Sequence, residues 1–230
     1  MIQTGVTLPF VPWLTIPLSA FAMCLVASVI VFFFAQTQAM SSEVMVLAGI
    51  ATLFMFQAAQ SFVQYIASPE VLQAIVFWLF GSLLGASWAN VPIVASLIGV
   101  ATLAVLPDIW QLTALRLGAS RAAAIGVDVQ ALRIKIFAVV ALLTSGAVAF
   151  VGTIGFVGLI APHIARIAVG EDQGLLLPMA ALVGADIMLA ASVRSKTLSP
   201  VAVIPIGIVT AVIGVPFLFF LILRGQRRHW

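Results

Sequence analysis

Residues 1–106 of this chain contain no lysine or arginine, and among them only Glu43 and Glu70 carry a charge. Long uncharged apolar runs are typical of membrane proteins, because a helix of about 20 apolar residues crosses the hydrocarbon core with its backbone hydrogen bonds satisfied internally. Of all 230 residues, 63% are hydrophobic and 7% are charged, whereas about a quarter of the residues in a soluble domain are charged. The sequence predicts an all-α, polytopic transmembrane helix bundle, with residues 1–230 as a single domain.

The apolar runs predict about seven spans. The run at 156–169 is short and contains Pro162, so we expect a broken helix packed inside the protein. Residues 71–88 are apolar but interrupted by Gln73, Gly81 and Gly85, which favours a short interfacial or re-entrant helix. The spans are expected at residues 13–35, 44–66, 89–106, 136–151, 156–169, 175–193 and 206–223.

One polar stretch, residues 107–135, interrupts the apolar pattern and holds four of the 10 basic residues. Because short loops rich in lysine and arginine stay cytoplasmic, we expect this stretch in the cytoplasm. Residues 113–127 within it read as two short helical pieces, separated at Gly118 and ended by Gly126. Two interpretations remain open for Arg116 and Arg121: a solvated loop that sets orientation, or a docking surface for a soluble subunit.

Several kinds of chemistry are excluded by missing patterns. The sequence has no GxxxxGK[ST] phosphate-binding loop, so the chain is not expected to hydrolyse ATP or to act as an enzyme. No set of ligating residues predicts a metal site or a bound cofactor, and the single Cys24 cannot form a disulfide within the chain. The net charge of +3 is too small and too scattered to indicate nucleic-acid binding.

A glycine series followed by a proline indicates an unusual backbone inside the membrane. Gly152, Gly155 and Gly158 precede Pro162, and each glycine lowers helix stability by about 1 kcal/mol relative to alanine. Such breaks are tolerated where they line a translocation pathway or where helices pack closely, and both interpretations remain open. The adjacent His163 could relay protons, but no carboxylate is spaced to orient it, and we favour a structural, hydrogen-bonded histidine.

Three charged residues near the end of the chain are further candidates. Asp186 lies near the middle of an expected span, where a carboxylate costs about 2.5 to 3.5 kcal/mol, so it should face a polar cavity or a neighbouring helix, or be protonated and inert. An ion-coupled carrier or channel that uses Asp186 is one possible function. Arg194 and Lys196 are expected on the outer side, where they either hold an acidic partner or reach the interface as ordinary snorkelling side chains.

Residues 152–170, GTIGFVGLIAPHIARIAVG, follow the pattern G-x-IGF-x-GL-x-x-PH-x-x-R. Through them the chain resembles the permease subunits of bacterial ABC importers for ferric siderophores, haem and cobalamin. Residues 47–50, 85–88, 205–211 and 214–217 are similar to that family as well. The resemblance implies a multi-pass protein of the inner membrane that imports a metal chelate. In this family the permease usually has ten spans, so the chain would lack three N-terminal ones and could be an inactive, truncated permease.

The resemblance also implies partners and site residues. The partners would be a second permease copy or paralogue, a periplasmic substrate-binding protein, membrane lipid and an ABC ATPase subunit that carries the ATP. Arg194 and Lys196 would meet the binding protein. The ATPase would contact residues within 115–127, namely Leu115, Arg116, Leu117, Gly118, Arg121, Ala122 and Gly126. The pathway and its broken helix would involve Gly152, Gly155, Phe156, Gly158, Pro162 and His163.

Overall fold

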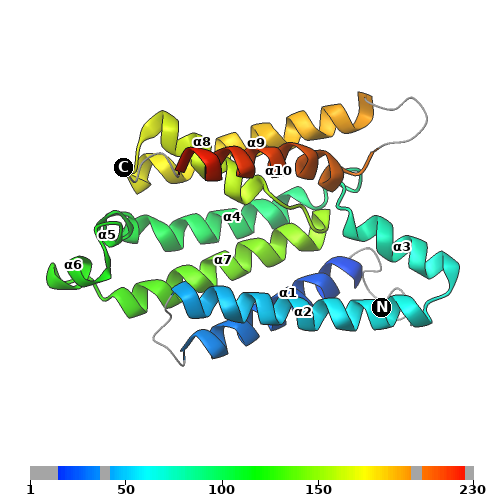
Figure 1. The fold of residues 1–230 in the computed structure, drawn as a ribbon, viewed down its shortest axis with the longest axis horizontal. Helices are drawn as coiled ribbons and strands as arrows, with labels where there is room; N and C mark the ends of the chain where they lie inside the picture. The colour runs from blue at the N-terminus through cyan, green and yellow to red at the C-terminus, as the bar shows by residue number, and fades with distance from the viewer. Residues whose placement is uncertain (1–14, 37–41, 198–203, 226–230) are drawn as a thin grey trace. The chain divides into compact units, whose positions relative to one another are not determined.

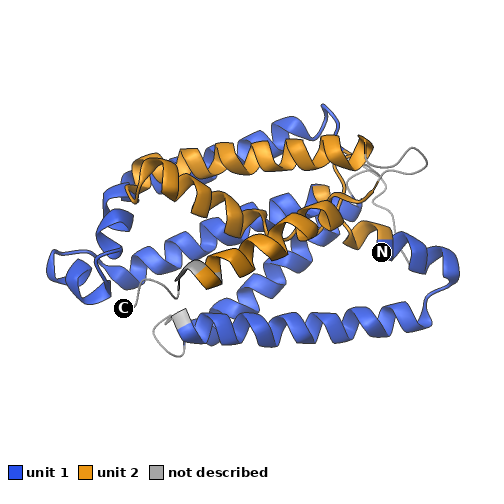
Figure 2. Cartoon of the chain, turned by 45° about the horizontal axis from the view of Figure 1, so that its top comes forward, with its two compact units in different colours: residues 1–76, 86–150 blue, residues 77–85, 151–230 orange. Residues whose placement is uncertain are grey.

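The computed structural model describes residues 15–36, 42–197 and 204–225. Every regular element within these residues is a helix (Figure 1), which confirms the all-α prediction. The chain divides into two compact units (Figure 2), and the division falls within the helix α3 (Pro69–Leu79). Unit 1 comprises residues 1–76 and 86–150, and unit 2 comprises residues 77–85 and 151–230.

Unit 1 holds the membrane helices that flank the polar stretch. In it, α1 packs on α2, and the long helix α4 continues through a short 3-10 turn, η2, into α5. The chain then forms α6 and returns along α7. The bounds are α1 Thr15–Gln36, α2 Ser42–Ile66, α4 Val91–Val105, η2 Leu106–Asp108, α5 Ile109–Leu115, α6 Ala119–Ala124 and α7 Val129–Val151.

Unit 2 is built from three helices and a short segment from earlier in the chain. Helix α8 (Val157–Val169) packs along α9 (Gln173–Thr197), and α10 (Ile206–Gly225) contacts both. Residues 77–85 join this unit although more than sixty residues separate them from α8 in the sequence. The unit therefore combines the end of α3 with the last three helices.

Five helical stretches in the described residues are long and apolar enough to cross a membrane: α1, α2, the stretch from α4 through η2 to α5, α7 and α9. The remaining two expected spans correspond to α8 and α10, whose apolar helices are shorter. The expected short helix in residues 71–88 is present as α3, which ends at Leu79, earlier than its apolar sequence suggests. The chain is a multi-pass membrane protein, in which α8 is short as the sequence predicts.

Two helices extend beyond the apolar runs that predict them. Helix α7 begins at Val129 instead of residue 136, and the carboxylate of Asp128 accepts a hydrogen bond from the Ala131 N–H at 2.9 Å. A side chain that caps the helix start in this way lets the helix begin in polar sequence. Helix α9 likewise continues to Thr197, so the basic side chains near its end lie on helical backbone.

Among the described residues, the buried positions hold mostly small side chains, whereas many large apolar side chains are exposed. Most buried core positions are alanine, and the largest fully buried side chains are Ser145 and Ser195. Aromatic residues such as Trp88 and Trp110 are 90% and 57% exposed. Small residues allow membrane helices to approach closely, while lipid solvates bulky apolar side chains as well as other side chains would. This distribution agrees with a membrane-embedded bundle.

Candidate functional site

The polar stretch of unit 1 folds into a compact helical element, which we call the docking segment (residues 107–135). Its core consists of Ala114 on α5, Ala122 on α6, Val127 between α6 and α7, and Leu132 on α7. Gly118 separates α5 from α6 with φ of 106° and ψ of 150°, a conformation that is essentially restricted to glycine. The two helical pieces and their glycine boundary were expected from the sequence, and both are present.

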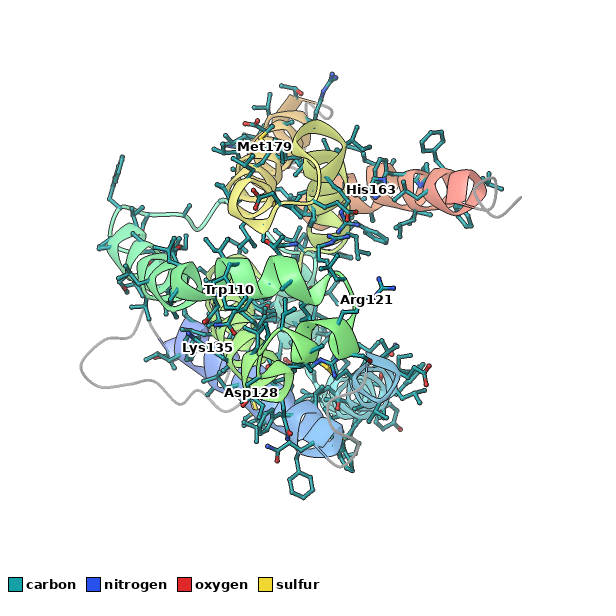
Figure 3. The ribbon with its side chains drawn as sticks, turned by 90° about the vertical axis from the view of Figure 1, so that its left-hand side faces the viewer. Trp110, Arg121, Asp128, Lys135, His163 and Met179 are labelled. Carbon is teal, nitrogen blue, oxygen red and sulfur yellow. The ribbon has the colours of Figure 1, made fainter. Side chains whose placement is uncertain are left out.

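The residues expected to contact an ATPase divide into an outer and an inner group. Arg116, Leu117 and Arg121 are exposed, and in Figure 3, which views this end of unit 1, Arg121 extends away from the ribbon. Ala122 is fully buried and Leu115 packs against the same core. The outer group, together with Gly118 and Gly126, is therefore exposed at the surface of the segment, and the inner group packs beneath it.

The docking segment contains an ion pair that the sequence did not predict. Lys135 Nζ lies 2.5 Å from the Asp108 carboxylate, and Gln111 donates a hydrogen bond to the other oxygen of that carboxylate. The two charges were visible in the sequence, since Asp108 and Lys135 lie at opposite ends of the same polar stretch. The pairing could not be recognised because the apolar pattern begins the next helix at residue 136, whereas Lys135 already lies within α7.

The expected break before α8 is an irregular segment, residues 152–156, that is fixed to residues 77–85. Gly152 has φ of 73°, and a Cβ atom there would lie 2.6 Å from the Trp78 carbonyl oxygen. The Thr153 hydroxyl donates to the Leu79 carbonyl, and the Ser82 N–H donates to the Val151 carbonyl at 2.9 Å. Gly152 is thus required for a close approach between two backbone segments of unit 2.

Helix α8 starts after a strained residue. Phe156 has φ of 70°, the one positive value found for a non-glycine residue in the described part of the chain. The Phe156 side chain fills the space beside Gly214 of α10, where a Cβ atom would lie 2.4 Å from Phe156 Cβ. Val157, the first residue of α8, lies near Gly184 in the middle of α9. The start of α8 therefore packs against the middle of α9 and the middle of α10.

The other predicted residues of the broken helix have different environments. Gly155 and Gly158 are exposed, and a Cβ atom at either would meet nothing within 4 Å. Pro162 lies within α8 and cannot donate the usual backbone hydrogen bond. His163, labelled in Figure 3, is partly buried, with its ring 5.8 Å from that of Phe217 in a T-shaped arrangement. The glycine pattern therefore marks a backbone contact at Gly152 and open surface at the other two positions.

The end of α9 forms one wall of a pocket of about 270 Å³, which we call the rim pocket. Ser195 and Ile204 exchange two hydrogen bonds: the Ser195 hydroxyl donates to the Ile204 carbonyl, and the Ile204 N–H donates to the Ser195 carbonyl at 3.2 Å. The exposed Lys196 lines the pocket, whereas Arg194 is exposed and does not. The lining residues are Phe77, Gly81, Ser82, Leu83, Leu84, Ser192, Ser195, Lys196, Ile204, Pro205 and Ile206.

Asp186 lies near the middle of α9 and is exposed. Leu182 and Leu189, one turn away on either side along the helix, are also exposed. The carboxylate thus belongs to an apolar outer face of α9. In the described residues no group of three or more histidine, cysteine, aspartate or glutamate side chains could hold a metal ion.

The described residues thus form a bundle of apolar helices, with two short helices in a polar segment and an irregular segment before α8. The chain belongs to the FecCD transport family, which matches residues 1–224. It is 35% identical to the hemin transport system permease protein HmuU of Yersinia pestis, over 91% of this chain and 63% of that protein. It is 32% identical to the vitamin B12 import system permease protein BtuC of Vibrio vulnificus, over 96% of this chain and 67% of that protein.

A solved structure gives the same picture of the fold. It is an inward-facing conformation of an ABC transporter assigned to the metal-chelate type. The TM-score is 0.79 at 32% identity, and the match covers 91% of this chain and 73% of the other. The chain thus spans about three fifths to three quarters of the length of the proteins it matches.

Proposed function

We propose that this chain is the permease subunit of an ABC importer that moves a metal chelate across the inner membrane into the cytoplasm. The observation that carries the proposal is the docking segment, a small helical element with its own alanine-rich core that follows a membrane span in a FecCD-family chain. ATP would be hydrolysed by a separate ATPase subunit, because this chain has no phosphate-binding loop. Arg116, Leu117 and Arg121 would contact that subunit.

The translocation pathway would run beside the start of α8. The open backbone at Gly155 and Gly158 supports this assignment, since a glycine that meets no neighbour among the described residues leaves room for cargo or for a second permease copy. The fixed segment at Gly152 and Phe156 would hold that surface in place. Irregular backbone at membrane depth is tolerated where it lines such a pathway.

The rim pocket would be part of the surface that receives a periplasmic binding protein. Among the described residues, the Lys196 ammonium lies within 4 Å of no carboxylate, and it lines a preformed pocket without acidic residues. An acidic side chain of a partner would therefore gain an ion pair there without breaking one. The relatives named for haemin and vitamin B12 support a large metal chelate as cargo, namely haem, cobalamin or a ferric siderophore.

Reconstitution tests the proposed function. The permease is purified with the ATPase and binding protein encoded beside it, and placed in proteoliposomes with haemin, cyanocobalamin or ferric siderophore as the probe. Uptake of one probe should require ATP and should fall about tenfold or more when the ATPase loses its phosphate-binding lysine. Failure to associate with any ATPase would contradict the proposal. Uptake that needs no ATPase and disappears in Asp186→Asn would instead favour an ion-coupled carrier.

Reversing the charge at the rim pocket should weaken binding-protein association. Lys196→Glu replaces an exposed cation with an anion, so we expect the association rate at low salt to fall about tenfold and the difference to shrink at high salt. Lys196→Arg keeps the charge and should behave like the unmodified protein. Surface plasmon resonance with the immobilised permease complex measures both rates. Equal rates for Lys196→Glu and the unmodified protein at low salt would remove this residue from the docking surface.

A further inference from the structure

The docking segment is joined to the membrane helices at both of its ends, and one ion pair connects these ends. Asp108 closes the η2 turn after α4, and Lys135 lies near the start of α7. Their charged groups are 2.5 Å apart. The pair therefore closes a loop that contains all of α5 and α6, and Figure 3 shows Lys135 at the end of unit 1 that carries them.

The ion pair is partly withdrawn from solvent. The Asp108 side chain is 12% exposed and the Lys135 side chain is 43% exposed. Gln111 Nε2 donates to Asp108 Oδ1 at 3.3 Å, and the Lys135 ammonium lies beside Asp108 Oδ2. Exposed ion pairs contribute little to stability, whereas a buried carboxylate that loses its partner is unfavourable. The burial of Asp108 makes this pair a specific link, unlike a chance surface contact.

The turn that the pair spans has the geometry of a hinge. A 3-10 turn between two α-helices is tighter than either helix, and such turns often mark a place where helices bend. Pro107 lies in this turn and removes one backbone hydrogen bond. Asp108 itself has φ of −103° and ψ of 5°, outside the helical region. Helix α5 is therefore less rigidly attached to α4 than a continuous helix would be.

The apolar core does not restrain this hinge. Its buried residues lie on α5, α6, the α6–α7 turn and α7, and the side chains packed against them lie on α5 and α7. None of these described core residues belongs to α4. Leu97 of α4 does contact Gly146 of α7, but both lie far along their helices from the docking segment. At the docking end, the polar pair joins the η2 turn after α4 to α7.

We propose that the Asp108–Lys135 ion pair positions the docking segment by holding the η2 hinge closed. A displacement of α5 and α6 by a bound ATPase would then be passed on to both α4 and α7, whereas an open hinge would absorb it before it reached α4. This inference rests on the proposed function, because it assigns the pair a role in coupling to a partner ATPase. Both residues are positioning residues, since neither contacts cargo or nucleotide.

The expected signature is uncoupling without loss of docking. Asp108→Asn and Lys135→Met each remove the ion pair but leave the exposed Arg116, Leu117 and Arg121 unchanged. In the reconstituted importer, ATPase retention and ATP hydrolysis should stay within about twofold of the unmodified complex, while probe molecules imported per ATP fall about tenfold, a size typical of coupling between sites. The double variant should be no worse than either single variant, because the two side chains act as one unit.

Matched variants separate coupling from general damage. Asp128→Asn makes the same chemical change in the same segment, and an asparagine still caps α7 through Ala131, so import per ATP should not change. Lys135→Arg keeps the positive charge and should retain most of the import per ATP. If Lys135→Met fails to fold because it leaves the Asp108 carboxylate unpaired, Asp108→Asn decides the test, since it removes the buried charge.

Each outcome bears on one proposal or the other. Suppose that the unmodified complex couples import to ATP hydrolysis and that the single variants keep its import per ATP. This result overturns the role of the ion pair and leaves the proposed function standing. A parallel fall in hydrolysis and import, with their ratio kept, assigns the pair a structural role only and also overturns the inference. An unmodified complex without ATP-dependent uptake contradicts the proposed function itself.

Discussion

Gly207→Ala should destabilise unit 2 by about 1–3 kcal/mol and lower its thermal unfolding midpoint by about 5 °C. A Cβ atom at Gly207 would lie 2.3 Å from the carbonyl oxygen of Phe80, the closest such contact among the described glycines. The Gly207 N–H also donates to this carbonyl at 3.0 Å. The obstacle is backbone, which cannot rotate away, so α10 and residues 77–85 would have to separate. Thermal unfolding of the purified protein in detergent measures the change.

The matched control is Gly184→Ala on α9. A Cβ atom there would lie 3.6 Å from Ala161 Cβ, an ordinary packing distance, and alanine is a better helix former than glycine. We expect an unfolding midpoint that is unchanged or slightly higher. If the two variants unfolded at the same temperature, the close approach between α10 and residues 77–85 would not be a constraint on this fold.

Gly214→Ala should disrupt the start of α8, and Phe156→Gly should partly repair it. The added methyl group would lie 2.4 Å from Phe156 Cβ and 2.5 Å from Phe156 Cγ, so the variant should unfold earlier and transport poorly. Phe156→Gly removes both atoms and places glycine at a positive φ that it adopts without strain. We expect a favourable interaction between the two substitutions of about 1–2 kcal/mol.

A double-mutant cycle measures this interaction from the unfolding midpoints of the two single variants, the double variant and the unmodified protein. Additive effects would show that Phe156 does not occupy the space beside Gly214. Uptake by the same four proteins then shows whether the position of Phe156, and not stability alone, controls the pathway.

The sequence was sufficient for the parts of the fold that depend on composition and on local turns. Runs of about 20 apolar residues predicted the long helices, because such a run has few stable alternatives in a bilayer. Gly118 and Gly126 predicted the ends of α5 and α6, because glycine is favoured where a chain leaves a helix with positive φ. Both glycines do have positive φ in the structure. Helix boundaries were less accurate where polar sequence is helical, as at the start of α7, because a hydropathy pattern does not register a capping side chain such as Asp128.

The tertiary contacts of the candidate sites could not be predicted from spacing. Gly152, Gly155 and Gly158 form a regular series in the sequence, but only Gly152 lies against another backbone segment. That contact involves Trp78, which is distant in the sequence and carries no matching signal. The Asp108–Lys135 pair was missed for the same reason, since opposite charges are common in a polar stretch and only the helical start of α7 brings these two together.

Two of the three tryptophans in the described residues face outward and can report on their surroundings. Trp88 and Trp110 are both largely exposed, and Trp110 belongs to α5 in the docking segment. Their fluorescence would respond to lipid, detergent or a bound subunit more than to the packing of the helices. A change in Trp110 emission on mixing with an ATPase would therefore detect complex formation at the docking segment.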